Sequence, residues 1–277
     1  MSARELPAIG QHPLLAEPVR VARRAAAAYL PAFLLLVMLV GLWEVAVRAL
    51  DIRPYILPAP SRVWTAFMDT RAVLPEHTWT TLQEALLGIT IGAAVGVFLA
   101  AIIASITLVR RVLYPLLIVS QTIPMIVLAP LLVIWFGLGM TPKVIIVALI
   151  AFFPVVVSTS DALLRADRDL IALVHSMGAN RLQTLWHVLI PSAIPSFFAG
   201  LKIASAYAIA GAVIAEWVGA SSGLGIYINR SSAAYRTDQI FVAIVIIAVL
   251  SMALFAAVHL LSRWAAPWMH LKDGGNS

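Results

Sequence analysis

The chain has 277 residues, of which 62% are hydrophobic and 12% are charged, with a formal net charge of +6 and no cysteine. Soluble domains average about 45–50% apolar and about 25% charged residues, so this composition indicates an integral membrane protein. It excludes a disulfide, a thiolate metal site and a cysteine nucleophile, and no Arg/Lys cluster with interleaved aromatic residues supports nucleic-acid binding.

The chain begins with a fairly polar stretch, residues 1–28, that we expect to be a cytoplasmic tail. The apolar run behind it is too long for a cleavable signal peptide. Six apolar segments are long enough to cross a membrane as helices, at about 20 residues each. They are expected near Tyr29–Leu50, Leu82–Ile106, Leu113–Leu138, Val144–Ser160, Ser192–Ala220 and Ile240–Leu261. The sequence therefore predicts an all-α membrane domain over residues 29–268 and a second cytoplasmic tail over residues 269–277.

The distribution of positive charge predicts how the spans are oriented. With both termini in the cytoplasm, the inner segments carry eleven Lys and Arg residues and the outer segments carry seven. The pair Arg110–Arg111, between the second and third spans, is the clearest single marker. Because positive charge concentrates on the cytoplasmic side, we expect a multi-pass protein of the cell (inner) membrane with both termini inside.

Two features are expected to organise the first half of the chain. The external connection Asp51–Thr81 contains LPAPSRVWTAF, which predicts a short interfacial helix. Three of its residues fit one helical face: Val63, Trp64 and Phe67. The second span carries glycines at four-residue spacing: Gly88, Gly92 and Gly96. Small residues at this spacing let two helices approach closely in lipid, so we interpret them as packing residues.

A polar break over Asp161–Pro191 separates the fourth and fifth spans, on the predicted cytoplasmic side. Its apolar residues have helical spacing in two runs. These are Leu170, Leu173, Val174 and Met177, and then Leu182, Leu185, Trp186 and Leu189. Gly178 suits the left-handed end of the first helix, and Asn180 with Gln183 has the spacing of a capping box. Such a helix pair needs a partner to cover its apolar faces, unless it packs on itself as a hairpin.

Polar residues inside the spans are candidates for a translocation path. Ser120, Gln121 and Thr122 lie in mid-membrane in the third span, where they either line a path or hydrogen-bond to neighbouring helices. Tyr207 is a further path candidate. Glu216 is expected at the outer mouth of the fifth span and Lys202 near its inner end, about 21 Å apart and too far to pair.

Enzymatic and metal chemistry lacks support in the sequence. The six His residues share no ligand spacing with carboxylates, so we expect no metal site. No Ser/His/Asp arrangement is present, so no catalytic residue is expected. The chain also contains no GxxxxGK[ST] phosphate loop, so we do not expect it to hydrolyse ATP itself.

Several stretches resemble the permease subunits of ABC importers. The polar break is similar to their cytoplasmic EAA loop: Asp167 and Asp169 stand in the lead-in, and Gly178 and Pro191 keep the spacing. Ala172 stands where that family has Glu. Other matching stretches resemble the nitrate/sulfonate/taurine type, and within it the thiamine-pyrimidine-precursor and riboflavin branch. They are Leu57–Ser61, Ser120–Pro124, Leu128–Leu131, Trp135–Gly137 and Ser222–Gly225.

This resemblance implies a type I ABC importer permease fold of six spans, with residues 161–191 as a coupling loop that docks on a separate ATPase. The docking residues that it implies are Asp167, Asp169, Leu170, Leu173, Val174, Met177, Gly178, Ala179 and Pro191. It implies three partners: a second permease copy, an ABC ATPase dimer that carries ATP and Mg, and an extracytoplasmic solute-binding protein. No cofactor is expected on this chain.

The resemblance also implies a solute, a thiamine-precursor pyrimidine or a similar heterocycle, with nitrate, aliphatic sulfonate or taurine as the alternative. A different class of function remains open from the residues alone. An ion-gradient-driven carrier or a channel needs no ATPase, but it should carry paired charged residues deep in its spans.

Overall fold

The computed structural model describes residues 17–267, and this range is built from helices joined by short connections. It divides into two units, and the boundary between them falls after Arg62 in the chain. Residues 1–16 of the expected first tail, and residues 269–277, lie outside the described range. Residues 17–28 are helical, because the first helix begins before the apolar run instead of with it.

The first unit is dominated by α1 (Glu17–Ala49), whose apolar stretch Leu30–Ala49 is long enough to span a membrane. Glu44 fixes the connection that follows. Its carboxylate accepts hydrogen bonds from the backbone N–H of Ser61 at 3.0 Å and from the Ser61 hydroxyl at 2.8 Å. Arg48, one turn further along α1, also binds Glu44. The LPAPS stretch is therefore held against the end of its own helix.

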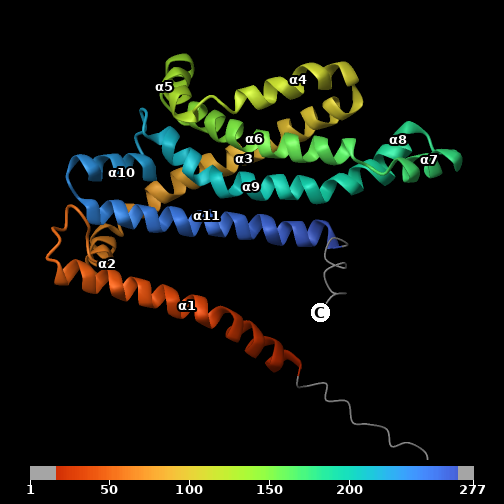
Figure 1. The fold of residues 1–277 in the computed structure, drawn as a ribbon. Helices are drawn as coiled ribbons and strands as arrows, with labels where there is room; N and C mark the ends of the chain where they lie inside the picture. The colour runs from red at the N-terminus through yellow and green to blue at the C-terminus, as the bar shows by residue number, and fades with distance from the viewer. Residues whose placement is uncertain (1–16, 268–277) are drawn as a thin grey trace, which may run out of the picture. The chain divides into compact units, whose positions relative to one another are not determined.

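The second unit contains the remaining helices (Figure 1). In chain order they are α2 (Pro60–Thr70), which begins at the end of the first unit, α3 (Leu74–Ser105), α4 (Thr107–Ser120), α5 (Met125–Phe136), α6 (Met140–Leu164), α7 (Arg168–Ser176), α8 (Arg181–Thr184), the π-helical segment η1 (Leu185–Leu189), α9 (Ile190–Glu216), α10 (Leu224–Ala233) and α11 (Thr237–Ala265). The long helices α6 and α9 run side by side, with α7 at one end of the bundle and α10 at the other (Figure 1). We call these the α7 end and the α10 end.

The predicted spans correspond to helices of the structure. In the described range, five helices or helical runs are long and apolar enough to cross a membrane, and the pair α4 and α5 makes a sixth if counted as one broken span. The span expected over Leu113–Leu138 consists of two helices instead of one, and these meet at an angle of 100°. Pro124 caps α5 in an extended conformation and cannot continue α4.

The core of the second unit lies where α3, α6, α9 and α11 pack together. The glycine stripe of α3 sets the closest of these contacts. A Cβ atom on Gly88 would collide with Val147 of α6, and one on Gly92 would collide with the carbonyl oxygen of Ala148. The prediction that these glycines serve helix packing is confirmed.

The α10 end contains one expected helix and one unexpected helix. Helix α2 forms where the sequence predicts it, and Trp64 stacks on Phe67 with ring centroids 5.6 Å apart. Its buried residue Ala66 packs in a cluster with Tyr227 of α10 and Val242 of α11. Helix α10 was not predicted, because ten residues with mixed polarity give no span signal.

Candidate functional site

Helix α7 is positioned by a side-chain cap at its first turn. Asp167 is the N-cap residue, and its Oδ1 accepts hydrogen bonds from the backbone N–H groups of Asp169 at 2.9 Å and Leu170 at 3.3 Å. Asp169 is exposed in the first turn, where a negative charge favours the helix dipole. Asp167 thus holds the helix, and Asp169 is available at its surface.

The predicted break between the two helical runs is confirmed in detail. Gly178 has φ +87°, a conformation that suits glycine, and its N–H donates to the carbonyl of His175 at 2.9 Å. The N–H of Ala179 reaches the carbonyl of Val174. The capping box then forms reciprocally: the Asn180 N–H donates to Gln183 Oε1 at 2.8 Å, and the Gln183 N–H donates to Asn180 Oδ1 at 2.9 Å.

The apolar side chains of α7 are largely uncovered. Leu173 is 57% exposed, Leu170 is also exposed and Val174 is half-buried. Met177, the C-cap residue directly after α7, is 79% exposed. A hairpin that packed on itself would bury these residues, so the self-packed alternative does not describe this structure. An apolar helix face that projects from the end of the bundle is a surface that a partner can cover.

The second helical run is not the separate amphipathic helix that the sequence predicts. Helix α8 has only four residues and continues through η1 into α9. Pro191 therefore lies in the first turn of α9 and does not end the segment. Pro191 lacks an N–H, and its ring crowds the carbonyl four residues earlier, which explains a wider π-helical turn directly before it. The N–H of Ile190 accordingly bonds five residues back, to Leu185.

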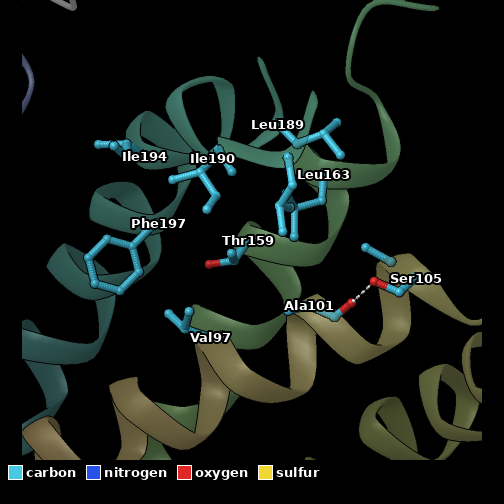
Figure 2. Close-up of a pocket in the computed structure, with 12 residues that line it drawn as sticks. Val97, Ala101, Ser105, Thr159, Leu163, Leu189, Ile190, Ile194 and Phe197 are labelled. Carbon is cyan, nitrogen blue, oxygen red and sulfur yellow. Dashed lines mark hydrogen bonds between the residues drawn. The ribbon is translucent and has the colours of Figure 1, made fainter. Parts of the chain in front are cut away.

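A cavity of about 490 Å³ adjoins this continuous helix, between α3, α6, η1 and α9 (Figure 2). Leu185 and Leu189 of η1 line it and so turn toward the spans, whereas Leu182 and Trp186 are exposed. The sequence predicts one common helical face for these four residues, but in the structure only two of them face the cavity. Figure 2 shows the hydroxyl of Thr159 at the cavity, where it has no hydrogen-bond partner in the described part of the chain.

The polar residues predicted for a path in the third span lie at the bend between α4 and α5. Ser120, Gln121 and Thr122 are all exposed there. The Ser120 hydroxyl donates to the carbonyl of Leu117 at 2.7 Å, and the Thr122 hydroxyl donates to that of Val119 at 2.8 Å. Both hydroxyls therefore bond within their own turn. A second cavity, of about 350 Å³, lies beside the bend and is lined in part by Ser120 and Gln121. Their place in a path stays a prediction.

The candidates on α9 occupy contrasting environments. Tyr207 is 61% exposed, on the same helical face as the exposed Ile203 and Ala210. Glu216 is 0% exposed and lies inside the α10 end of the bundle, so it is not on the surface of an open mouth. Lys202 is half-buried. Tyr207 is thus the exposed one of these three residues, and its place in a path stays a prediction.

The sequence interpretation missed a buried ion pair. Lys143 Nζ lies 2.8 Å from Glu84 Oε1, and both side chains are almost fully buried. Lys143 falls between the spans expected over Leu113–Leu138 and Val144–Ser160, but α6 begins at Met140 and includes it. The signal in the sequence was Glu84 itself, a carboxylate one turn before Gly88 in an apolar span. In the described range, no group of three or more His, Asp or Glu side chains could hold a metal ion.

Comparisons with known proteins agree with this architecture. Residues 88–271 match the family described as binding-protein-dependent transport system inner membrane component. The formylaminopyrimidine transport permease ThiX of Halalkalibacterium halodurans is 35% identical over 236 residues, 85% of this chain and 94% of that protein. The riboflavin transport permease RibX of Chloroflexus aurantiacus is 36% identical over 237 residues, 84% of this chain and 88% of that protein. The taurine permease TauC of Escherichia coli is 30% identical over 243 residues, 84% and 87% of the two chains.

A solved structure has the same fold. An inward-facing structure of the MetNI methionine ABC transporter matches with a TM-score of 0.62 and 20% identity, over 70% of this chain and 97% of that chain. The predicted all-α permease fold of the type I ABC importers is confirmed by this likeness. Together with the family match and the full-length relatives, it places the chain among the binding-protein-dependent inner-membrane permeases of ABC transporters.

Proposed function

We propose that this chain is the membrane subunit of an ATP-driven importer and that α7 is its docking helix for a separate ATPase. The exposed apolar face of α7, with Leu173 and Met177 uncovered at one end of the bundle, is the observation that carries the proposal. Asp167 and Asp169 add negative charge beside this face, which can meet Arg or Lys on the partner. Ala172 supplies no carboxylate, so docking relies on apolar contact and on the two aspartates.

The route from α7 to the spans supports a mechanical role. Gly178 and the Asn180–Gln183 capping box connect α7 to α8, and α8 continues through η1 into α9. Closure of an ATPase dimer on α7 would therefore displace a segment that is continuous with a spanning helix. In this proposal α9 transmits the displacement to the translocation path, which Tyr207 and the Ser120–Thr122 bend would line.

The assembly follows from the same proposal. Two copies of the permease enclose the path, an ATPase dimer binds ATP and Mg at the cytoplasmic side, and a solute-binding protein delivers the solute outside. This orientation puts the α7 end and both termini in the cytoplasm, as the charge distribution predicts. The α10 end then faces the solute-binding protein.

The proposed solute is a small heterocycle of the formylaminopyrimidine or riboflavin kind. Sequence likeness to ThiX and RibX, at 35% and 36% identity, supports it over the taurine permease at 30%. A taurine-like sulfonate is the alternative solute. One observation favours a different class, a carrier driven by an ion gradient, because Glu84 and Lys143 are paired charges inside the spans. Membership in the family of binding-protein-dependent permeases outweighs this observation.

Solute uptake into vesicles distinguishes these functions. Liposomes that contain the permease and its ATPase, with ATP on the ATPase side and the binding protein on the other, should accumulate labelled formylaminopyrimidine. Taurine should not compete at the same concentration. Accumulation that needs an ion gradient but not ATP would contradict the importer, and uptake of taurine alone would overturn the proposed solute.

A further inference from the structure

Two glutamates and a lysine lie together inside the α10 end of the bundle. Glu84 of α3 and Glu216 of α9 are 1% and 0% exposed. Glu216 binds Thr81, which lies one turn before Glu84 on the same face of α3, so the two carboxyl groups are neighbours. Lys143 of α6 binds Glu84 from the other side at 2.8 Å. Three core helices therefore contribute three ionisable side chains to one site closed to solvent.

The hydrogen bonds of this site leave one oxygen without a donor. Glu216 Oε1 accepts from the Thr81 hydroxyl at 2.6 Å, and Glu216 Oε2 accepts from the backbone N–H of Gly225. Glu84 Oε1 accepts from Lys143. Glu84 Oε2 has no hydrogen-bond donor in the described part of the chain. The unsatisfied oxygen thus belongs to the carboxyl group that faces Glu216.

Two ionised carboxylates cannot face each other here at low cost. Each would repel the other in a medium of low dielectric constant, and the single ammonium group would leave one negative charge uncompensated. Like charges this close are relieved when one group keeps a proton. That proton would form a hydrogen bond between Glu84 Oε2 and Glu216. It would also bring the net charge of the site to zero.

We propose that Glu84 and Glu216 share one bound proton, so that the site formed with Lys143 and Thr81 is a neutral proton-binding site. The other ionisable groups nearby lie toward its edge. His77 accepts the backbone N–H of Gly223 at 3.0 Å, and its ring lies 5.5 Å from that of Tyr227. Glu76 and Arg230 act on His77 and are exposed. In the described part of the chain, the hydrogen bonds of the two carboxyl groups go to Thr81, Gly225 and Lys143 and not to these edge groups.

The bound proton would also hold the α10 end together. Glu216 accepts the N–H of Gly225, and Thr81 accepts the N–H of Leu224 at 2.9 Å, so the site fixes the first turn of α10. A Cβ atom on Gly223 or Gly225 would collide with Glu216, so the loop packs directly against this side chain. Release of the proton at alkaline pH would place two repelling charges beneath this loop and loosen it.

Infrared spectroscopy of the full-length permease in lipid nanodiscs detects such a proton directly. The wild type should show the C=O stretching band of a protonated carboxylic acid at neutral pH, and the band should disappear as the pH rises. Glu84→Gln should remove it. Glu76→Gln, at an exposed position of the same helix, should keep it. Absence of the band from the wild type, or its persistence in Glu84→Gln, would overturn the proposal.

Thermal unfolding gives an independent test. A proton held by the folded state stabilises it at lower pH, and that stabilisation is lost as the pH rises and the proton leaves. The wild-type midpoint should therefore fall by several degrees between neutral and alkaline pH. In Glu84→Gln the amide N–H replaces the bound proton, so its midpoint should fall less. An equal fall of the unfolding midpoint in the wild type and in Glu84→Gln would contradict the shared proton. A midpoint that depends on sodium concentration instead of pH would contradict it too.

Discussion

Replacing Leu173 by Glu is expected to weaken assembly of the permease with its ATPase strongly while the helical bundle stays folded. Leu173 is 57% exposed on α7 and makes no core contact, so the fold loses little. Docking would bury the new charge in an apolar contact, which is costly without a partner. A loss of at least about 2 kcal/mol, as for a central interface residue, corresponds to roughly thirtyfold weaker binding. Co-purification and ATPase activity of the reconstituted complex measure it.

The neighbouring substitution Ala172→Glu is the matched control. It adds the same charge one residue earlier, on a different face of α7, at the position where the ABC permease family has Glu. Assembly should be retained, and it should strengthen if the ATPase offers a basic residue there. Equal loss in both variants would show that charge anywhere on α7 is harmful, and normal assembly of Leu173→Glu would remove Leu173 from the docking face.

Replacing Lys143 by Met should destabilise the permease strongly. The substitution leaves Glu84 and Glu216 buried without a positive partner, and breaking a buried ion pair costs about 3–5 kcal/mol. The free energy of unfolding of the purified protein should fall by this amount. Lys202→Met is the control, because Lys202 is a half-buried lysine on a neighbouring core helix. A similar small effect in both variants would contradict the structural importance of the Glu84–Lys143 pair.

Much of the fold could be predicted because it depends on residues that are close together in the sequence. Long apolar runs give the spans, and glycines four residues apart identify the face of α3 that packs on α6. Asn180 and Gln183 could be identified as a capping box because both partners lie within one turn. Gly178 could be predicted for the same reason, since a helix end depends on adjacent backbone groups.

The features that could not be predicted depend on distant or competing residues. Glu84 and Lys143 are 59 positions apart, and their pairing depends on how closely α3 packs on α6. The run after Gly178 has the period of a separate helix, but it continues into α9 because η1 accommodates Pro191 within the helix. The role of Glu216 depends on the first turn of α10, which itself gave no signal.

The central claim is that α7 docks on the ATPase, and single-cysteine cross-linking tests it most directly. The natural chain has no cysteine, so Met177→Cys and Tyr235→Cys each introduce a unique thiol, at positions that are both 79% exposed. Met177 follows α7, and Tyr235 lies between α10 and α11. In the assembled transporter, the thiol at position 177 should cross-link to the ATPase and the thiol at position 235 should not. A cross-link to the ATPase from position 235, with none from position 177, would contradict the proposed docking and the orientation together.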